Sequence, residues 1–132
     1  MAREIKFRAW NKNLREYIDI NNIVVDPING DVVDLGGYEL LEVNHEAVLE
    51  QYTGLKDKNG VEIYEGDIVE VKSHLYKDII GIVKFWEFNS SFVVIKNSKE
   101  FNIPTNLSAT MDGFKSYEVI GNIHKNPELL EE

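Results

Sequence analysis

The chain has no cysteine among its 132 residues. This absence excludes disulfide bonds, thiolate catalysis and cysteine-ligated zinc or iron–sulfur sites. The apolar runs are too short to span a bilayer, and the N-terminal sequence MAREIKFRAW lacks the apolar segment and cleavage site of a secretion signal. We therefore expect a cytoplasmic protein with no membrane association.

Sequence motifs of the common enzyme classes are also missing. The chain contains no Gly-x-Ser-x-Gly, P-loop or Gly-x-Gly-x-x-Gly pattern. Its histidines, His45, His74 and His124, are isolated and lack the His-x-x-x-His spacing of many metal sites. We therefore expect no catalytic residue, no bound metal and no cofactor, and interpret the protein as a non-enzyme.

The charged residues are distributed unevenly along the chain. The formal net charge is -9, and residues 31–70 alone contain eleven Asp or Glu against two Lys. An acidic surface repels phosphate, which disfavours nucleic acid as a partner. The remainder of the chain is close to neutral, so nucleic-acid binding stays an alternative.

Turn residues separate short runs of β-branched and aromatic residues along most of the chain, which is typical of a barrel or sandwich. The length fits one ordinary domain. We therefore predict a mainly β, single-domain fold of short antiparallel strands. Helix is an alternative over residues 45–52, and residues 20–25 are expected to be extended or irregular. The expected strands are residues 4–10, 15–18, 38–43, 47–52, 68–88, 92–95, 101–104 and 117–123.

The first strand, residues 4–10, alternates polar and apolar residues, which predicts a half-buried strand with Ile5, Phe7 and Ala9 on one face. At the other end of the chain, Asn126, Pro127 and Glu128 form an N-cap, a first-turn proline and a first-turn acid. They predict a terminal helix of one or two turns.

The segment from Gln51 to Val71, QYTGLKDKNGVEIYEGDIVEV, concentrates turns and carboxylates. The pair Asn59–Gly60 is the strongest short-range hairpin signal. A calcium loop with Gly60 in the glycine position would begin at Leu55 and end at Gly66, and neither residue can be a ligand. We therefore interpret the acidic residues as solvated turn residues. A metal-dependent hydrolase built on Glu65, Asp67 and distant histidines is a third alternative.

Two aromatic residues, Phe85 and Trp86, lie on opposite faces of the expected strand 68–88. One face must belong to the core. We expect the other face, with Trp86, to pack in a two-sided sheet or a subunit interface; a stacking platform for a base or a peptide is the alternative. With the lysines from Lys72 to Lys99, such a platform would suit single-stranded nucleic acid, which is the main alternative function.

Three blocks of the sequence resemble the YopX-like proteins encoded by phages and prophages of Gram-positive bacteria. They are IKFRAW at residues 5–10, QYTGLKD continuing to IYEGDIV at residues 51–69, and IGNI with NPELL at residues 120–130. The resemblance implies a β-rich fold whose part after Glu65-Gly66-Asp67 is similar to an SH3-type barrel. It implies a phage or prophage setting in a bacterial host cell, but no reaction and no catalytic residue.

We therefore expect one YopX-like domain over residues 1–132, with a β-rich part (1–50), an SH3-like barrel part (51–125) and a short terminal helix (126–132). The expected function is that of a non-enzymatic binding or assembly module. We expect a homo-oligomer, with a host or phage protein as a further partner. The candidate binding residues are Tyr52, Thr53, Asp57, Glu65, Asp67 and Trp86.

Overall fold

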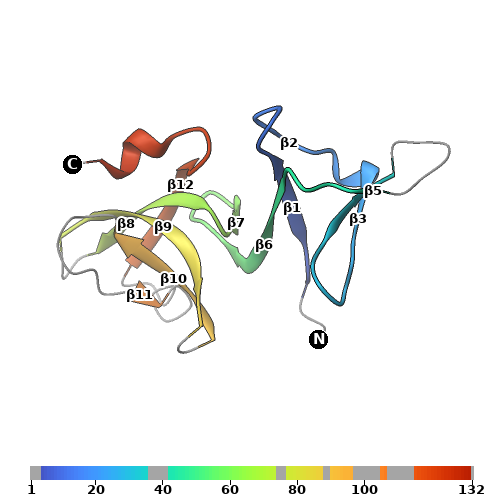
Figure 1. Ribbon diagram of the computed structural model, residues 1–132. Coiled ribbons are helices and arrows are strands. Elements are labelled where there is room, and N and C mark those ends of the chain that lie inside the picture. The colour runs from blue at the N-terminus through green and yellow to red at the C-terminus, as the bar shows by residue number, and fades with distance from the viewer. Residues whose placement is uncertain are drawn as a thin grey trace. The chain divides into compact units, whose positions relative to one another are not determined.

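A computed structural model describes residues 4–35, 42–73, 77–87, 90–96, 105–106 and 115–131. The fold is mainly β, and every strand pair in these ranges is antiparallel, which confirms the predicted fold class (Figure 1). The chain divides into two compact units, Ile5–Gln51 and Tyr52–Glu132 with Met1–Glu4. That these units form a single domain stays a prediction.

The N-terminal unit contains a hairpin, one strand that continues into the second unit, and a small three-stranded sheet. In the larger sheet the order is β2-β1-β6, and in the smaller it is β3-β4-β5. The bounds are β1 Phe7–Asn11, β2 Glu16–Tyr17, the 3-10 turn η1 Ile20–Asn22, β3 Ile23–Val25, β4 Val32–Asp34, β5 Glu42–Val43 and β6 Ala47–Lys56.

Several predictions for this unit can be compared with the structure. Residues 47–56 form strand β6, so the helix alternative over residues 45–52 is wrong. Residues 20–25 are a 3-10 turn followed by a strand. Most of the expected strand 38–43 and all of 101–104 lie outside the described residues.

Strand β1 is buried on both faces at its C-terminal end, whereas the sequence predicted a half-buried strand. Ala9 is fully buried against Ile23 and Val32. Trp10 is only 3% exposed because its ring packs edge-on against Tyr17, with 5.0 Å between ring centroids. Ile5 precedes the strand and is 62% exposed, so it does not share the core face with Ala9.

The C-terminal unit is built on a five-stranded sheet with the order β11-β10-β9-β8-β12. This sheet curls into a half-barrel, as predicted from the barrel-like pattern (Figure 1). The short strand β7 pairs with the second half of β6. The bounds are β7 Glu62–Tyr64, β8 Asp67–Ser73, β9 Ile79–Trp86, β10 Ser91–Lys96, β11 Thr105–Asn106 and β12 Lys115–Asn122.

Both faces of the curled sheet are apolar and covered. Val69, Val71, Val83, Val94 and Tyr117 of this sheet form a buried cluster with Ile63 of β7. The opposite face carries Ile68 and Ile82, which pack against Leu130 from the C-terminal end of the chain. This double burial explains why apolar residues stand next to each other in Ile68–Val69 of β8 and Ile82–Val83 of β9.

The expected terminal helix is a single 3-10 turn, η3 Pro127–Leu130. Its last residues bond in the i to i+3 pattern, with Glu131 N donating to Glu128 O, and four residues are too few for a stable α-helix. Asn126 does not cap the turn through its side chain. Its Oδ1 instead accepts a hydrogen bond from Asn122 N, 3.2 Å away. Asn126, Pro127 and Glu128 thus occupy the predicted N-cap and first-turn positions, although Asn126 makes no side-chain cap bond.

Candidate functional site

Asp57 begins the turn that joins β6 to β7, and its carboxylate binds three backbone N–H groups. Oδ1 accepts from Asn59 N at 2.8 Å and from Val61 N at 2.9 Å. Oδ2 accepts from Val119 N of β12 at 2.9 Å. Asp57 is only 6% exposed. The carboxylate therefore connects its own turn to a strand more than sixty residues away.

The same turn meets β12 at further points. Lys58 N donates to Tyr117 O at 3.0 Å, and Lys58 Nζ lies 3.3 Å from Glu118 Oε2. Because β12 is at the edge of the curled sheet, these groups occupy backbone positions that another strand would otherwise bind. The turn of residues 57–61 thus covers the edge of β12.

Opposing effects act on the pKa of Asp57. Burial is the largest single effect and raises the pKa, because a charged carboxylate loses hydration. The hydrogen bonds from Val119, Val61 and Asn59, with the positive charge of Lys58, act in the opposite direction. Together they outweigh burial and hold the pKa of Asp57 below its ordinary value of 3.8. A carboxylate with a lowered pKa and both oxygens bound to backbone is a poor proton donor or acceptor at neutral pH.

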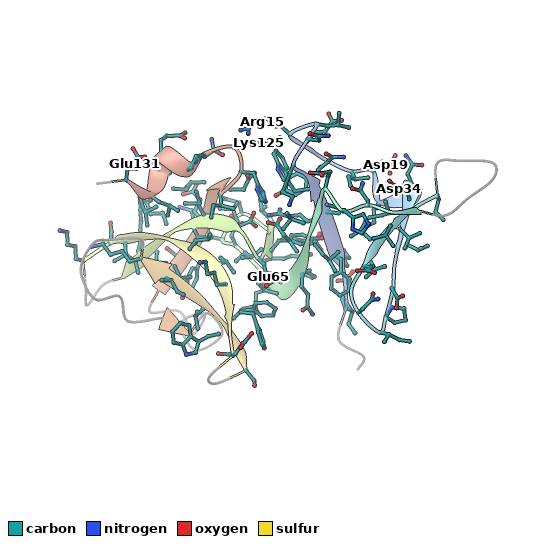
Figure 2. All side chains as sticks on the ribbon, in the orientation of Figure 1. Arg15, Asp19, Asp34, Glu65, Lys125 and Glu131 are labelled. Atoms are coloured by element: carbon teal, nitrogen blue, oxygen red, sulfur yellow. The ribbon has the colours of Figure 1, made fainter. Side chains whose placement is uncertain are left out.

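Asp67 performs a similar task in the next turn. Its Oδ2 accepts a hydrogen bond from Tyr64 N at 2.8 Å, and the residue is 3% exposed. Glu65, labelled in Figure 2, lies with Gly66 in this turn between β7 and β8 and is half-buried. Gly66 has a φ of +85°, a conformation that favours glycine. In the turn formed by the EGD sequence, the Asp67 side chain therefore binds backbone. The prediction that the acidic residues of this segment are solvated is wrong for Asp57 and Asp67, which are both buried.

Tyr52 and Thr53 join β6 to β7 at an irregular place in the ladder. The register shifts between Tyr52 and Lys56. Thr53 Oγ1 donates to Ile63 O at 2.8 Å and accepts from Leu55 N at 3.2 Å, which supplies hydrogen bonds where the ladder is disrupted. The Tyr52 ring packs on Tyr64, with 5.4 Å between centroids, and Tyr52 is 4% exposed.

The structure therefore brings together Tyr52, Thr53, Asp57 and Asp67 as side chains that order one segment of backbone. Trp86 lies elsewhere, on the hairpin of β9 and β10. Its cross-strand neighbour is Ser91, while Phe85 pairs with Phe92 and packs edge-on against it at 5.4 Å. Phe85 and Trp86 are 45% and 37% exposed. A binding role for any of the six candidate residues stays a prediction.

A polar cluster in the N-terminal unit had not been foreseen. Glu50 is 5% exposed, and its Oε1 lies 2.8 Å from Arg8 Nε and accepts a hydrogen bond from Tyr17 OH at 3.0 Å. The Arg8 guanidinium carbon lies 4.6 Å from the centre of the Tyr17 ring. Arg8 and Glu50 are register partners on β1 and β6. Their separation of 42 residues along the chain leaves no local signal for the pairing.

Within the described ranges, no group of three His, Asp or Glu side chains is placed to hold a metal ion. In the same ranges, no helix is long and apolar enough to cross a membrane.

The sequence profile described as "YopX protein" matches residues 6–131. The chain belongs to the YopX family. Protein EF1440 from Enterococcus faecalis is similar to it in crystal structure, with 28% sequence identity and a TM-score of 0.60 over 98% of this chain and 100% of that one. Protein yopX from Bacillus subtilis is similar at 27% identity and a TM-score of 0.60, over 95% and 97% of the two chains. No curated protein matches the sequence.

Segment 51–71 lies within the residues that match the YopX family. In this YopX-family protein, Thr53, Asp57 and Asp67 of the segment each make a hydrogen bond to backbone. The structural neighbours are named without an activity.

Proposed function

We propose that this YopX-family protein is a non-enzymatic binding or assembly module, encoded by a phage or prophage and acting in the cytoplasm of a bacterial host cell. It associates with itself or with a host or phage protein. The observation that carries this proposal is the exposed aromatic pair, Phe85 and Trp86, at the end of a hairpin with a buried base.

The hairpin of β9 and β10 combines a fixed base with an apolar end. Val83 and Val94 are buried in the core and are register partners. Two residues further along β9, Phe85 is held against Phe92 but remains 45% exposed. Aromatic residues are enriched at protein interfaces because they bury large areas with few rotatable bonds. Phe85, ordered by Phe92, and Trp86 thus present partly exposed aromatic rings on the two faces of β9, which suits protein binding.

A non-enzymatic role is supported by how the polar residues of segment 51–71 are used. Both oxygens of Asp57 and one oxygen of Asp67 accept backbone hydrogen bonds, and both residues are buried. Buried carboxylates whose oxygens accept backbone hydrogen bonds are poorly accessible to a substrate. The backbone hydrogen bonds of Asp57 and Asp67 thus account for the carboxylates of segment 51–71 without a bound ligand.

The proposal is tested by expressing a tagged and an untagged copy together in a Gram-positive host that carries the phage. Proteins that co-purify with the tagged copy, including the untagged copy, are quantified for the wild type and for the Phe85→Ser/Trp86→Ser variant. Leu14→Ser is the matched control, because Leu14 is 67% exposed in the turn between β1 and β2.

We expect at least one protein to be retained by the wild type and by Leu14→Ser and to be lost from the double variant. Circular dichroism of all three proteins checks that folding is unchanged. Identical recovery in all three, or no specific recovery in any, contradicts the proposal.

Nucleic-acid binding is a second candidate, supported by one feature of β9. Lys84 and Trp86 are both exposed, and strand alternation places them on the same face. A lysine beside an indole would bind phosphate and stack a base. Fluorescence anisotropy with a labelled single-stranded oligonucleotide at low salt tests this reading. Salt-sensitive binding that Trp86→Ala weakens supports it, and no binding by the wild type removes it.

A further inference from the structure

The small sheet of the N-terminal unit has an exposed apolar face. Val24 of β3, Val33 of β4 and Val43 of β5 are register partners across the three strands. Directly paired residues share a face, so the three valines form a row. Val24 is 46% and Val43 38% exposed, while Val33 is half-buried. The core residues Ile23 and Val32 are on the opposite face.

Leu35 extends this row. Its N–H donates to Asn22 O at 2.8 Å, which continues the pairing of β4 beyond Asp34. Leu35 is two residues from Val33 and therefore lies on the same side of the sheet. It is 40% exposed. We call these four residues, Val24, Val33, Leu35 and Val43, the valine face.

The segment that contains the valine face is acidic, and the four Lys or Arg of the N-terminal unit all precede residue 16. Residues 16–55 contain nine Asp or Glu and no Lys or Arg. Asp19 is exposed before η1, Asp34 is half-buried at the end of β4, and Asp26 and Asp31 flank the turn between β3 and β4. Figure 2 labels Asp19, which precedes η1, and Asp34, which pairs with Ile23 and so lies on the core face, opposite the valine face.

We propose that the valine face docks a basic protein segment, one that carries aliphatic side chains between lysines or arginines. The aliphatic groups would cover the valine row, and the cations would face the surrounding carboxylates. The four-residue patch is small, so the contact is a transient one with a dissociation constant of about 1–100 μM.

The negative charge near the valine face favours a basic protein segment over a second copy of this chain, nucleic acid or an anionic lipid surface. A second copy docked face to face would bring equal clusters of carboxylates together, and like charges across an interface are unfavourable. Nucleic acid and anionic lipid surfaces are repelled in the same way. A basic segment gains attraction on approach and loses it as salt is added. This surface is separate from the Phe85–Trp86 hairpin and has its own partner.

The test uses the full-length protein and three fluorescent nonapeptides: one alternating Lys and Val, one alternating Lys and Ser, and one alternating Glu and Val. Anisotropy at low salt measures their affinities. Chemical-shift changes in the ¹⁵N-labelled protein locate the site. We expect the Lys/Val peptide to bind about tenfold more tightly than the Lys/Ser peptide, the Glu/Val peptide not to bind, and the shifts to centre on β3, β4 and β5.

Two variants separate the apolar and the charged contribution. Val24→Thr/Val43→Thr keeps side-chain shape and β-propensity but adds hydroxyl groups. Asp19→Asn/Asp26→Asn/Asp31→Asn removes charge and keeps a side-chain acceptor in each turn. Each is expected to weaken binding of the Lys/Val peptide about five- to tenfold. The matched control is Glu87→Gln/Glu128→Gln/Glu131→Gln, which removes three exposed carboxylates of the other unit.

Three outcomes overturn the proposal: equal binding of the Lys/Val and Lys/Ser peptides, equal weakening by the control variant, or shifts that centre on the C-terminal unit. The Phe85→Ser/Trp86→Ser protein should bind the Lys/Val peptide like the wild type. The two proposals can therefore fail independently. Loss of partner binding by the hairpin would not change peptide binding at the valine face, and loss of peptide binding would not change partner binding by the hairpin.

Discussion

The Asp57 carboxylate accepts hydrogen bonds from three backbone N–H groups in place of backbone carbonyl acceptors. Its three acceptor contacts reach two positions in its own turn and one on β12. A buried acceptor that binds three N–H groups cannot be removed without leaving some of them unsatisfied. We therefore expect Asp57 to contribute strongly to the free energy of unfolding of the C-terminal unit.

Replacing Asp57 with Asn should lower the free energy of unfolding by about 2–3 kcal/mol, because the amide nitrogen cannot accept a hydrogen bond from an N–H group. Urea unfolding followed by circular dichroism measures the change. Asp78→Asn, at an exposed position of the same unit, is the control for loss of one carboxylate and should change stability by less than about 0.5 kcal/mol. Equal stability of the two variants would show that the Asp57 contacts are dispensable.

The stabilisation by Asp57 should depend on pH in a definite direction. The pKa of Asp57 is lowered on folding from its ordinary value of 3.8, so the folded state favours the charged form. The stability difference between wild type and Asp57→Asn should be constant above that value and shrink as the pH falls through the lowered pKa. Urea midpoints between pH 7 and pH 2.5 measure it. A difference that grows as the pH falls from 7 to 5 would mean that the pKa is raised instead.

Residue roles in segment 51–71 could be predicted only in part. Local chemistry indicated the turns, because Asn59–Gly60 and Gly66 suit the positive φ values found at Gly60 and Gly66. The contact of Asp57 with Val119 crosses 62 residues, and a single sequence has no local pattern that specifies such a pairing.

At the scale of elements, β12 is an eight-residue strand at the edge of a sheet. An open edge of that length invites pairing with another chain. Here the turn of residues 57–61 supplies Asp57 Oδ2 to Val119 N and Lys58 N to Tyr117 O. The edge is thereby protected by a loop instead of a strand.

Disruption of this protection should be visible at a single amide. In Asp57→Ala, the Val119 N–H loses its acceptor and should exchange with solvent at least about tenfold faster than in the wild type at neutral pH. The Val83 amide, in the central strand β9 of the same sheet, is the reference for global unfolding. NMR hydrogen exchange measures both after correction for the change in global stability. Equal acceleration of the two amides would mean that Asp57 affects only the whole unit.

The strands were the most predictable elements, because β-branched runs and turn residues mark them locally. Residues 79–86 and 91–96 form strands where the sequence predicted them. The terminal helix was overestimated, since Pro127 and Glu128 begin a turn that ends after Leu130. Leu130 packs against Ile68 and Ile82, a contact that the local pattern does not contain.

For the whole molecule, the uneven charge has a thermodynamic consequence. The unit Ile5–Gln51 carries nine Asp or Glu against four Lys or Arg. Self-repulsion of that kind destabilises a folded unit at low salt. The same asymmetry underlies the preference of the valine face for a basic partner.

Neutralising Asp19, Asp26 and Asp31 together with Asn should raise the free energy of unfolding at low salt by about 0.5 kcal/mol. The gain should fall toward zero near 0.5 M NaCl, where the charges are screened. Urea unfolding at the two salt concentrations measures it. A gain that persists unchanged at high salt would show that the carboxylates act through their turns and not through charge.

We propose that segment 51–71 maintains the fold while the hairpin of β9 and β10 contacts a partner. Hydrogen–deuterium exchange of the protein alone and in its isolated complex tests this most directly. Peptides covering residues 83–92 should become protected in the complex, and those covering residues 52–71 should not change. Protection of residues 52–71 with no change over residues 83–92 would contradict the claim.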